Sequence, residues 1–166
     1  MPALGTGVIA PDFTLPTVEG KQSSLADALK KGPVLLAFFK TSCPVCQYAF
    51  PFFERVYQAN QDQNVTVLGV SQDSLKDTTG FLKDYGVTFP VAIDDEKNRY
   101  AVSNAYGLTN VPTAFLIAPG GEIEVSSVGW SKADVEEINR RLAQYRKQQP
   151  APLWRKGEDV QDFRAG

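Results

Sequence analysis

Runs of consecutive apolar residues define the expected core of the chain. Residues 34–39 are apolar at every position, and residues 65–70 and 113–118 are largely apolar. Runs of this kind are typical of strands that are buried on both faces of a sheet. Shorter runs at residues 89–93 and 122–128 predict two further strands, and the Pro-Gly-Gly turn before the last one predicts an antiparallel hairpin.

Between these runs the apolar positions recur at helical spacing. The sequence predicts helical segments at residues 25–29, 44–56, 74–85, 98–106 and 132–146. Strands that alternate with helices are typical of α/β proteins with right-handed crossovers, so we expect a central mixed sheet flanked by helices. Residues 12–24 predict a β-hairpin as an N-terminal extension. The acidic run 94–96 is interpreted as a solvated turn that leads into a helix.

The periodic part of the chain ends near residue 147. We therefore expect one domain over residues 1–147, followed by a polar tail over residues 148–166. Trp154 and Phe163 lie in this tail, which is expected to be either flexible or docked on the domain through these two side chains.

Composition excludes several classes of function. The 166 residues carry a net charge of −2 with no basic stripe, so no nucleic-acid partner is expected. No apolar stretch is long enough to span a membrane, and the N-terminal residues do not resemble a signal peptide. The sequence as written predicts a cytoplasmic protein, or a periplasmic or other extracytoplasmic one if a leader has been removed. It contains no histidine, so Ser-His-Asp and Cys-His catalysis are excluded, and no metal or cofactor is expected.

The two cysteines, Cys43 and Cys46, form a CxxC segment where the first strand meets a helix. This order places Cys43 at the helix N-terminus, where free N–H groups and the helix dipole stabilise a thiolate. Cys43 is the expected attacking thiol, and Cys46 the expected resolving thiol. The alternatives are half of a zinc site and a structural disulfide. The remaining zinc ligands are missing, and a disulfide that closes so short a loop would add little stability.

A second motif, Val111-Pro112-Thr113, stands just before a predicted strand. Pro112 is interpreted as a cis-proline that exposes the Val111 backbone as an edge for a substrate segment. In the ordinary interpretation it merely starts the strand. Pro44, between the two thiols, is a further candidate for substrate contact.

These motifs resemble the redoxin branch of the thioredoxin-like superfamily, which contains the TlpA/ResA-like thiol-disulfide oxidoreductases and the AhpC/TSA peroxiredoxins. The similarity extends over about residues 9–142 and rests on residues 10–15, the CPVC segment, 85–90, 105–108, 111–117 and 121–123. It implies a thioredoxin fold and an enzyme that acts on protein or small-molecule disulfides and dithiols. It also implies the roles already given to Cys43, Cys46 and Pro112, and leaves the oligomeric state open.

The sequence departs from the family patterns at several positions. Ala37 and Ala49 stand where thioredoxins and TlpA/ResA-like proteins, respectively, place an acidic residue near the disulfide, so no proton acceptor for Cys46 is evident. Phe39 replaces the usual Trp and is either an aromatic platform for substrate or a core residue. The peroxiredoxin pattern PxxxTxxC is broken, because Leu36 and Lys40 occupy its Pro and Thr positions. A thiol peroxidase of the AhpC/TSA type and a redox-inactive peptide-binding module are therefore the alternative functions.

Overall fold

The computed structural model describes residues 2–61 and 64–166. Its core is a five-stranded sheet in the order β5-β4-β3-β6-β7. The strands are β3 (Val34–Phe39), β4 (Thr66–Ser71), β5 (Val91–Ile93), β6 (Thr113–Ile117) and β7 (Ile123–Val128). The central strand β3 pairs in parallel with β4 and antiparallel with β6, which confirms the predicted mixed sheet.

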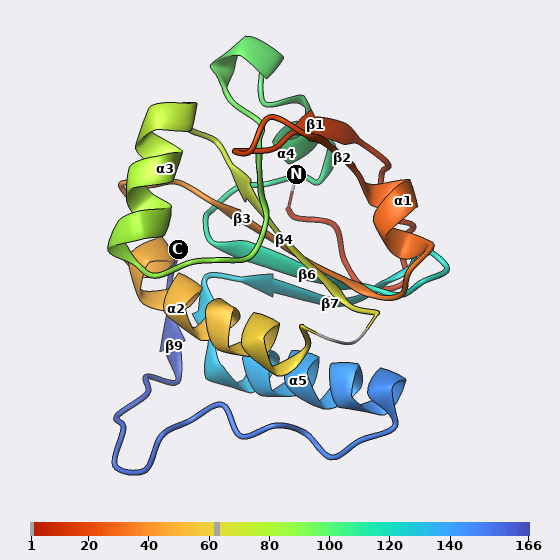
Figure 1. Ribbon diagram of the computed structural model, residues 1–166, viewed down its shortest axis with the longest axis vertical. Coiled ribbons are helices and arrows are strands. Elements are labelled where there is room, and N and C mark those ends of the chain that lie inside the picture. The colour runs from red at the N-terminus through yellow and green to blue at the C-terminus, as the bar shows by residue number, and fades with distance from the viewer. Residues whose placement is uncertain (1, 62–63) are drawn as a thin grey trace.

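Helices cover both faces of this sheet (Figure 1). They are α1 (Leu25–Leu29), α2 (Pro44–Ala59), α3 (Leu75–Asp84), α4 (Ala101–Ala105) and α5 (Lys132–Arg146). Alternate residues of β3 serve the two faces: Leu35, Ala37 and Phe39 pack with α2, α3 and α5, whereas Val34, Leu36 and Phe38 pack with α1 and α4. In the described part of the chain, no helix is both long and apolar enough to cross a membrane.

The N-terminal hairpin is present as predicted. It consists of β1 (Thr14–Pro16) and β2 (Gln22–Ser24), which pair antiparallel. Ser24 ends the hairpin and caps α1, because its Oγ accepts a hydrogen bond from the Asp27 N–H at 3.1 Å.

The segment after β5 differs from two predictions, one for a single helix over residues 98–106 and one for a solvated acidic run at residues 94–96. The single helix expected over 98–106 is split into a 3₁₀ turn, η1 (Glu96–Asn98), and the short helix α4. The break lies at Arg99 and Tyr100, whose φ values of 54° and 51° are incompatible with a continuous right-handed helix.

The interpretation of the acidic run as solvated is wrong for Asp94. This carboxylate is fully buried and accepts hydrogen bonds from Asn98 Nδ2, the Val102 N–H, and both the N–H and the hydroxyl of Ser103. Four donors from the next two turns of chain satisfy its oxygens and hold the start of α4 against β5.

The tail is docked along α5 and α2 rather than extended into solvent (Figure 1). Leu153 and Val160 are buried, and Trp154 packs against Phe52 with ring centroids 5.5 Å apart. At its end β9 (Phe163–Arg164) pairs antiparallel with β8 (Trp130–Ser131). Phe163 keeps 61% of its surface exposed, so its backbone rather than its side chain makes the contact.

Candidate functional site

Cys43 is positioned by the junction of β3 and α2. After the buried strand, residues 40–42 lead to Cys43, which is the N-cap residue of α2, and Pro44 occupies the first helical position. The Cys43 Sγ accepts a hydrogen bond from the Cys46 N–H at 3.3 Å. Sulfur thus takes the place of the oxygen that usually caps a helix. Cys43 is partly exposed, and both cysteines are free thiols.

Cys46 lies one turn further along α2 and has no exposed surface. Burial raises the pKa of the Cys46 thiol far above its ordinary value of 9.0, and the charges on Cys43 and Asp73 raise it further. A backbone interaction with Lys40 lowers the pKa and offsets part of this effect. Cys46 is therefore a neutral thiol at physiological pH.

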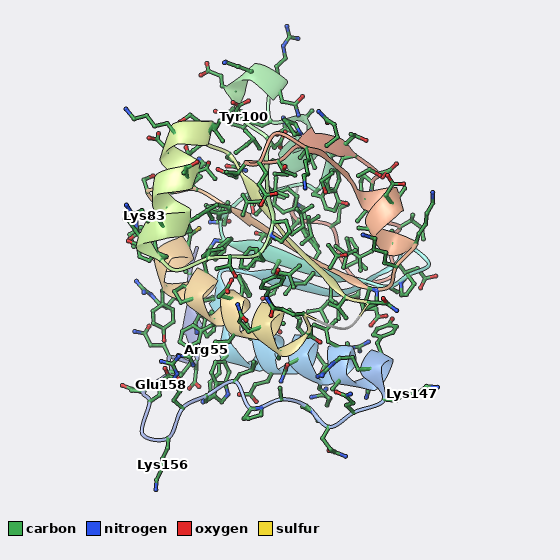
Figure 2. All side chains as sticks on the ribbon, viewed as in Figure 1. Arg55, Lys83, Tyr100, Lys147, Lys156 and Glu158 are labelled. Atoms are coloured by element: carbon green, nitrogen blue, oxygen red, sulfur yellow. The ribbon has the colours of Figure 1, made fainter. Side chains whose placement is uncertain are left out.

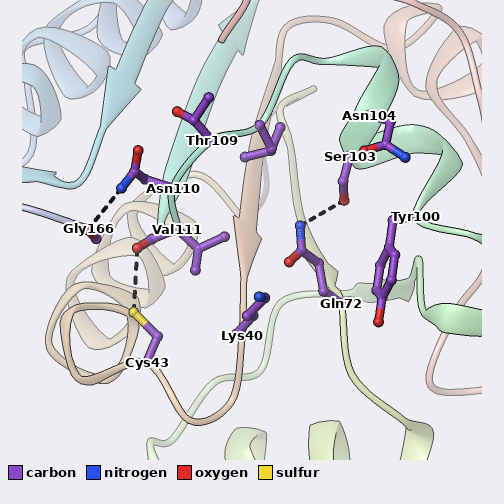
Figure 3. Close-up of a pocket in the computed structure, with 11 residues that line it drawn as sticks. Lys40, Cys43, Gln72, Tyr100, Ser103, Asn104, Thr109, Asn110, Val111 and Gly166 are labelled. Carbon is purple, nitrogen blue, oxygen red and sulfur yellow. Dashed lines mark hydrogen bonds between the residues drawn. The ribbon is translucent and has the colours of Figure 1, made fainter. Parts of the chain in front are cut away.

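The loop before β6 brings Val111 and Pro112 to the thiols. The Val111–Pro112 peptide bond is cis, and the Cys43 thiol donates a hydrogen bond to the Val111 carbonyl at 3.4 Å (Figure 3). The structure therefore joins two motifs that are 68 residues apart in sequence.

The other two candidates for substrate contact lie in different environments. Pro44 is exposed beside the thiols. Phe39 is fully buried, with its ring centroid 4.3 Å from that of Phe50 and 4.8 Å from that of Phe81. Of the two interpretations of Phe39, the structure places it in the core.

Asp73 is a part of the site that sequence analysis did not identify. Its Oδ2 accepts a hydrogen bond from the Thr41 N–H at 2.7 Å, and Gln47 Nε2 donates to the Thr41 carbonyl at 3.0 Å. These two contacts fix the loop that delivers Cys43. A signal was available, because residues after neighbouring parallel strands, here β3 and β4, meet at the same edge of the sheet.

A cavity of about 420 Å³ opens beside Cys43 (Figure 3). Polar and apolar groups contribute to its lining in similar measure, and Gln72 Nε2 donates to Ser103 Oγ at 3.0 Å within it. No group of three or more His, Cys, Asp or Glu side chains suited to a metal ion occurs among the residues that the structure describes. The cavity is lined by Lys40, Cys43, Gln72, Tyr100, Ser103, Asn104, Leu108, Thr109, Asn110, Val111 and Gly166.

Comparison with known proteins places this arrangement in a family. A model of the AhpC/TSA family matches residues 6–126. The chain belongs to this family. It is similar to the thiol-disulfide oxidoreductase ResA of Geobacillus thermodenitrificans (35% identity over 137 residues, covering 81% of this chain and 76% of the relative). It also matches ResA of Bacillus subtilis (35% over 122 residues, 73% and 66%).

Solved structures agree with this membership. A thiol:disulfide interchange protein of the thioredoxin family from Chlorobium tepidum superposes with a TM-score of 0.66 at 28% identity, over 83% of this chain and 96% of that one. MTB DsbF superposes with a TM-score of 0.69 at 25% identity, over 84% and 98%. The predicted thioredoxin fold, the redoxin branch and the thiol-disulfide oxidoreductase class are confirmed.

Proposed function

We propose that the chain exchanges electrons with disulfides through Cys43 as the nucleophile and Cys46 as the resolving thiol. One observation carries this proposal: two thiols separated by one turn of α2 have opposite environments. Cys43 is partly exposed at the cavity, and Cys46 has no exposed surface. A substrate sulfur can therefore reach the first thiol, whereas the second is left to react with Cys43.

In the reducing direction the Cys43 thiolate attacks one sulfur of a substrate disulfide. The substrate S–S bond breaks, and one substrate sulfur leaves as a thiolate that takes a proton from solvent. The Cys46 N–H and the N-terminus of α2 stabilise the attacking thiolate. The other substrate sulfur stays bound to Cys43 as a mixed disulfide.

Cys46 completes the reaction. It loses its proton, and its thiolate attacks the Cys43 Sγ, so that the mixed disulfide breaks and the second substrate thiol leaves. The substrate has gained two electrons and two protons, and the protein holds a Cys43–Cys46 disulfide that an external dithiol must reduce. Ala37 and Ala49 offer no carboxylate to accept the Cys46 proton, so this step is expected to be slow at neutral pH.

Substrates in this proposal are protein or small-molecule disulfides that reach Cys43 beside Val111. An extended segment could pair with the Val111 backbone as an added strand only where that edge is free. The direction of electron flow depends on the redox poise of the compartment in which the protein acts. The compartment itself stays a prediction.

A thiol peroxidase is the second candidate, favoured by the name of the family. The site differs from what that reaction needs: Lys40 stands where the peroxidase pattern has its Thr, and no arginine occurs among the described residues that line the cavity. The described lining of the cavity thus offers Cys43 no guanidinium to orient a peroxide.

The test is a pair of second-order rate constants, measured by stopped flow on one sample of reduced protein. We expect turnover of a disulfide substrate such as a glutathione mixed disulfide, and a rate with hydrogen peroxide no higher than that of an ordinary accessible thiolate. A peroxide rate constant several orders of magnitude above that level would make Cys43 a peroxidatic cysteine and overturn the assignment.

A further inference from the structure

The last residues of the tail lie directly against the substrate edge. Asn110 Nδ2 donates a hydrogen bond to the Gly166 carbonyl at 3.1 Å (Figure 3). A Cβ atom placed on Gly166 would lie 2.5 Å from the Val111 carbonyl oxygen. This is the carbonyl that accepts the Cys43 thiol, so the tail occupies space next to the reacting sulfur.

A first anchor holds the tail on α2, the helix that begins with the thiols. Both Nη atoms of Arg55 donate to the carboxylate of Glu158, at 2.7 Å and 2.6 Å, and Nη1 also donates to the Leu153 carbonyl at 2.8 Å (Figure 2). The Arg55 guanidinium lowers the pKa of Glu158 to about 2. A bidentate pair of this kind fixes geometry as well as charge.

A second anchor fixes the tail between Glu158 and its end. The Gln161 N–H donates to Tyr48 Oη at 3.0 Å, and Trp130 Nε1 donates to the Gln161 carbonyl at 2.6 Å. Beyond it, Gly129 permits a close approach of the tail, because a Cβ atom at this position would lie 2.5 Å from the Arg164 carbonyl oxygen. Two separate anchors, at Glu158 and at Gln161, thus hold the tail where it passes α2.

We propose that residues 164–166 act as a substrate filter, which restricts this enzyme to small-molecule disulfides and excludes extended protein segments. The inference rests on the proposed function and names its substrate class. A segment that pairs with Val111 must lie about 4.8 Å from it, which is the distance between neighbouring strands in a sheet. Gly166 already occupies the space beside Val111 where such a segment would lie. The cavity of about 420 Å³ remains as the approach to Cys43, and it is large enough for a small disulfide.

The polar groups in the lining of this cavity agree with a small polar substrate. Lys40 supplies a cation, and Gln72, Asn104 and Asn110 supply amide groups that can bind carboxylates and peptide groups. None of the described residues that line the cavity is acidic.

The experiment frees the tail after folding. A site for a sequence-specific protease replaces the exposed turn 155–157 in the full chain, and the cut protein is separated from its peptide, with loss of the peptide verified by mass. The specificity constant kcat/KM is then measured with insulin and with hydroxyethyl disulfide. We expect at least a tenfold rise with insulin and less than a twofold change with hydroxyethyl disulfide. Adding back a synthetic peptide of residues 158–166 should reverse the rise.

Point variants provide an independent measurement without cleavage. The double variant Glu158→Gln/Tyr48→Phe weakens both anchors, and Asp27→Asn/Tyr57→Phe is the matched control, which removes the same groups away from the tail. In the Glu158→Gln/Tyr48→Phe variant, we expect both kcat/KM with insulin and the deuterium uptake of residues 159–166 to rise. In the control variant, neither should change. An unchanged insulin rate after release of the tail overturns the filter, as does an equal fall with both substrates. Absence of turnover with both substrates in the uncut protein would instead refute the proposed function.

Discussion

Cys43 and Cys46 are separated by one turn of α2, yet they lie in opposite environments. Cys43 is the N-cap residue and remains partly exposed, whereas Cys46 points into the core that also holds Ala37 and Ala49. The difference follows from helix geometry, because the cap lies outside the helix and the third helical position faces back across the first turn. The cap position of Cys43, together with the packing of Cys46 in the core, thus produces one accessible and one protected thiol.

The largest expected effect comes from removing each thiol in turn. Cys46→Ser should leave the first attack intact and halt the reaction at the mixed disulfide, so that the protein accumulates as a covalent adduct with its substrate. Cys43→Ser should form no adduct and show no turnover. Mass spectrometry after incubation with hydroxyethyl disulfide measures both outcomes. An adduct on Cys46 in the Cys43→Ser variant would show that the two environments do not define the two roles.

A smaller effect is expected in the alkylation of the reduced protein. Cys43 should react with iodoacetamide at least tenfold faster than Cys46, because Cys46 is both inaccessible and protonated. Peptide mapping after limited labelling at pH 7 decides the order. The comparison between the thiols fails if Cys46 is labelled first.

The raised pKa of Cys46 predicts the pH dependence of the resolving step. Because the pKa lies well above its ordinary value, the thiolate fraction increases about tenfold for each pH unit between pH 7 and 9. Release of the second substrate thiol should increase in proportion. Single-turnover release from a preformed mixed disulfide on Cys43 measures this step alone, and a plateau below pH 8 would contradict the assignment.

The elements that position the thiols were predictable from local sequence. The run from Val34 to Phe39 is apolar throughout because β3 is covered on both faces, and the change to helical spacing at Pro44 marks the start of α2. These signals are local, so the CxxC segment could be placed at a strand end and a helix start without any knowledge of distant contacts.

The features that sequence analysis missed depend on distant contacts. Asp94 is buried because donors up to nine residues further on satisfy it, and the break at Arg99 and Tyr100 has no local signal. The two-residue strand β9 lacks any periodicity and forms only because Trp130 and Ser131 offer a partner. Asp73 likewise acquires its role only when β4 is placed beside β3.

The smallest predicted effect concerns Asp73, which acts on Cys46 through charge and on Cys43 through its loop. Asp73→Asn keeps an oxygen that can accept the Thr41 N–H but removes the negative charge that raises the pKa of Cys46. Because this charge is the smallest of the causes of the shift, and such interactions are worth about 1 kcal/mol or less near a surface, the resolving step should accelerate by less than about fivefold at pH 7.

Asp73→Ala is the matched variant, because it removes the charge and also leaves the Thr41 N–H without its acceptor, which costs about 1–3 kcal/mol. It should lower the melting temperature, whereas Asp73→Asn should leave it nearly unchanged. The single-turnover assay distinguishes this positioning role from direct proton transfer. If Asp73 accepted the Cys46 proton, Asp73→Asn would slow the resolving step tenfold or more and flatten its pH dependence, and the protected thiol would then owe its reactivity to a carboxylate outside its own helix.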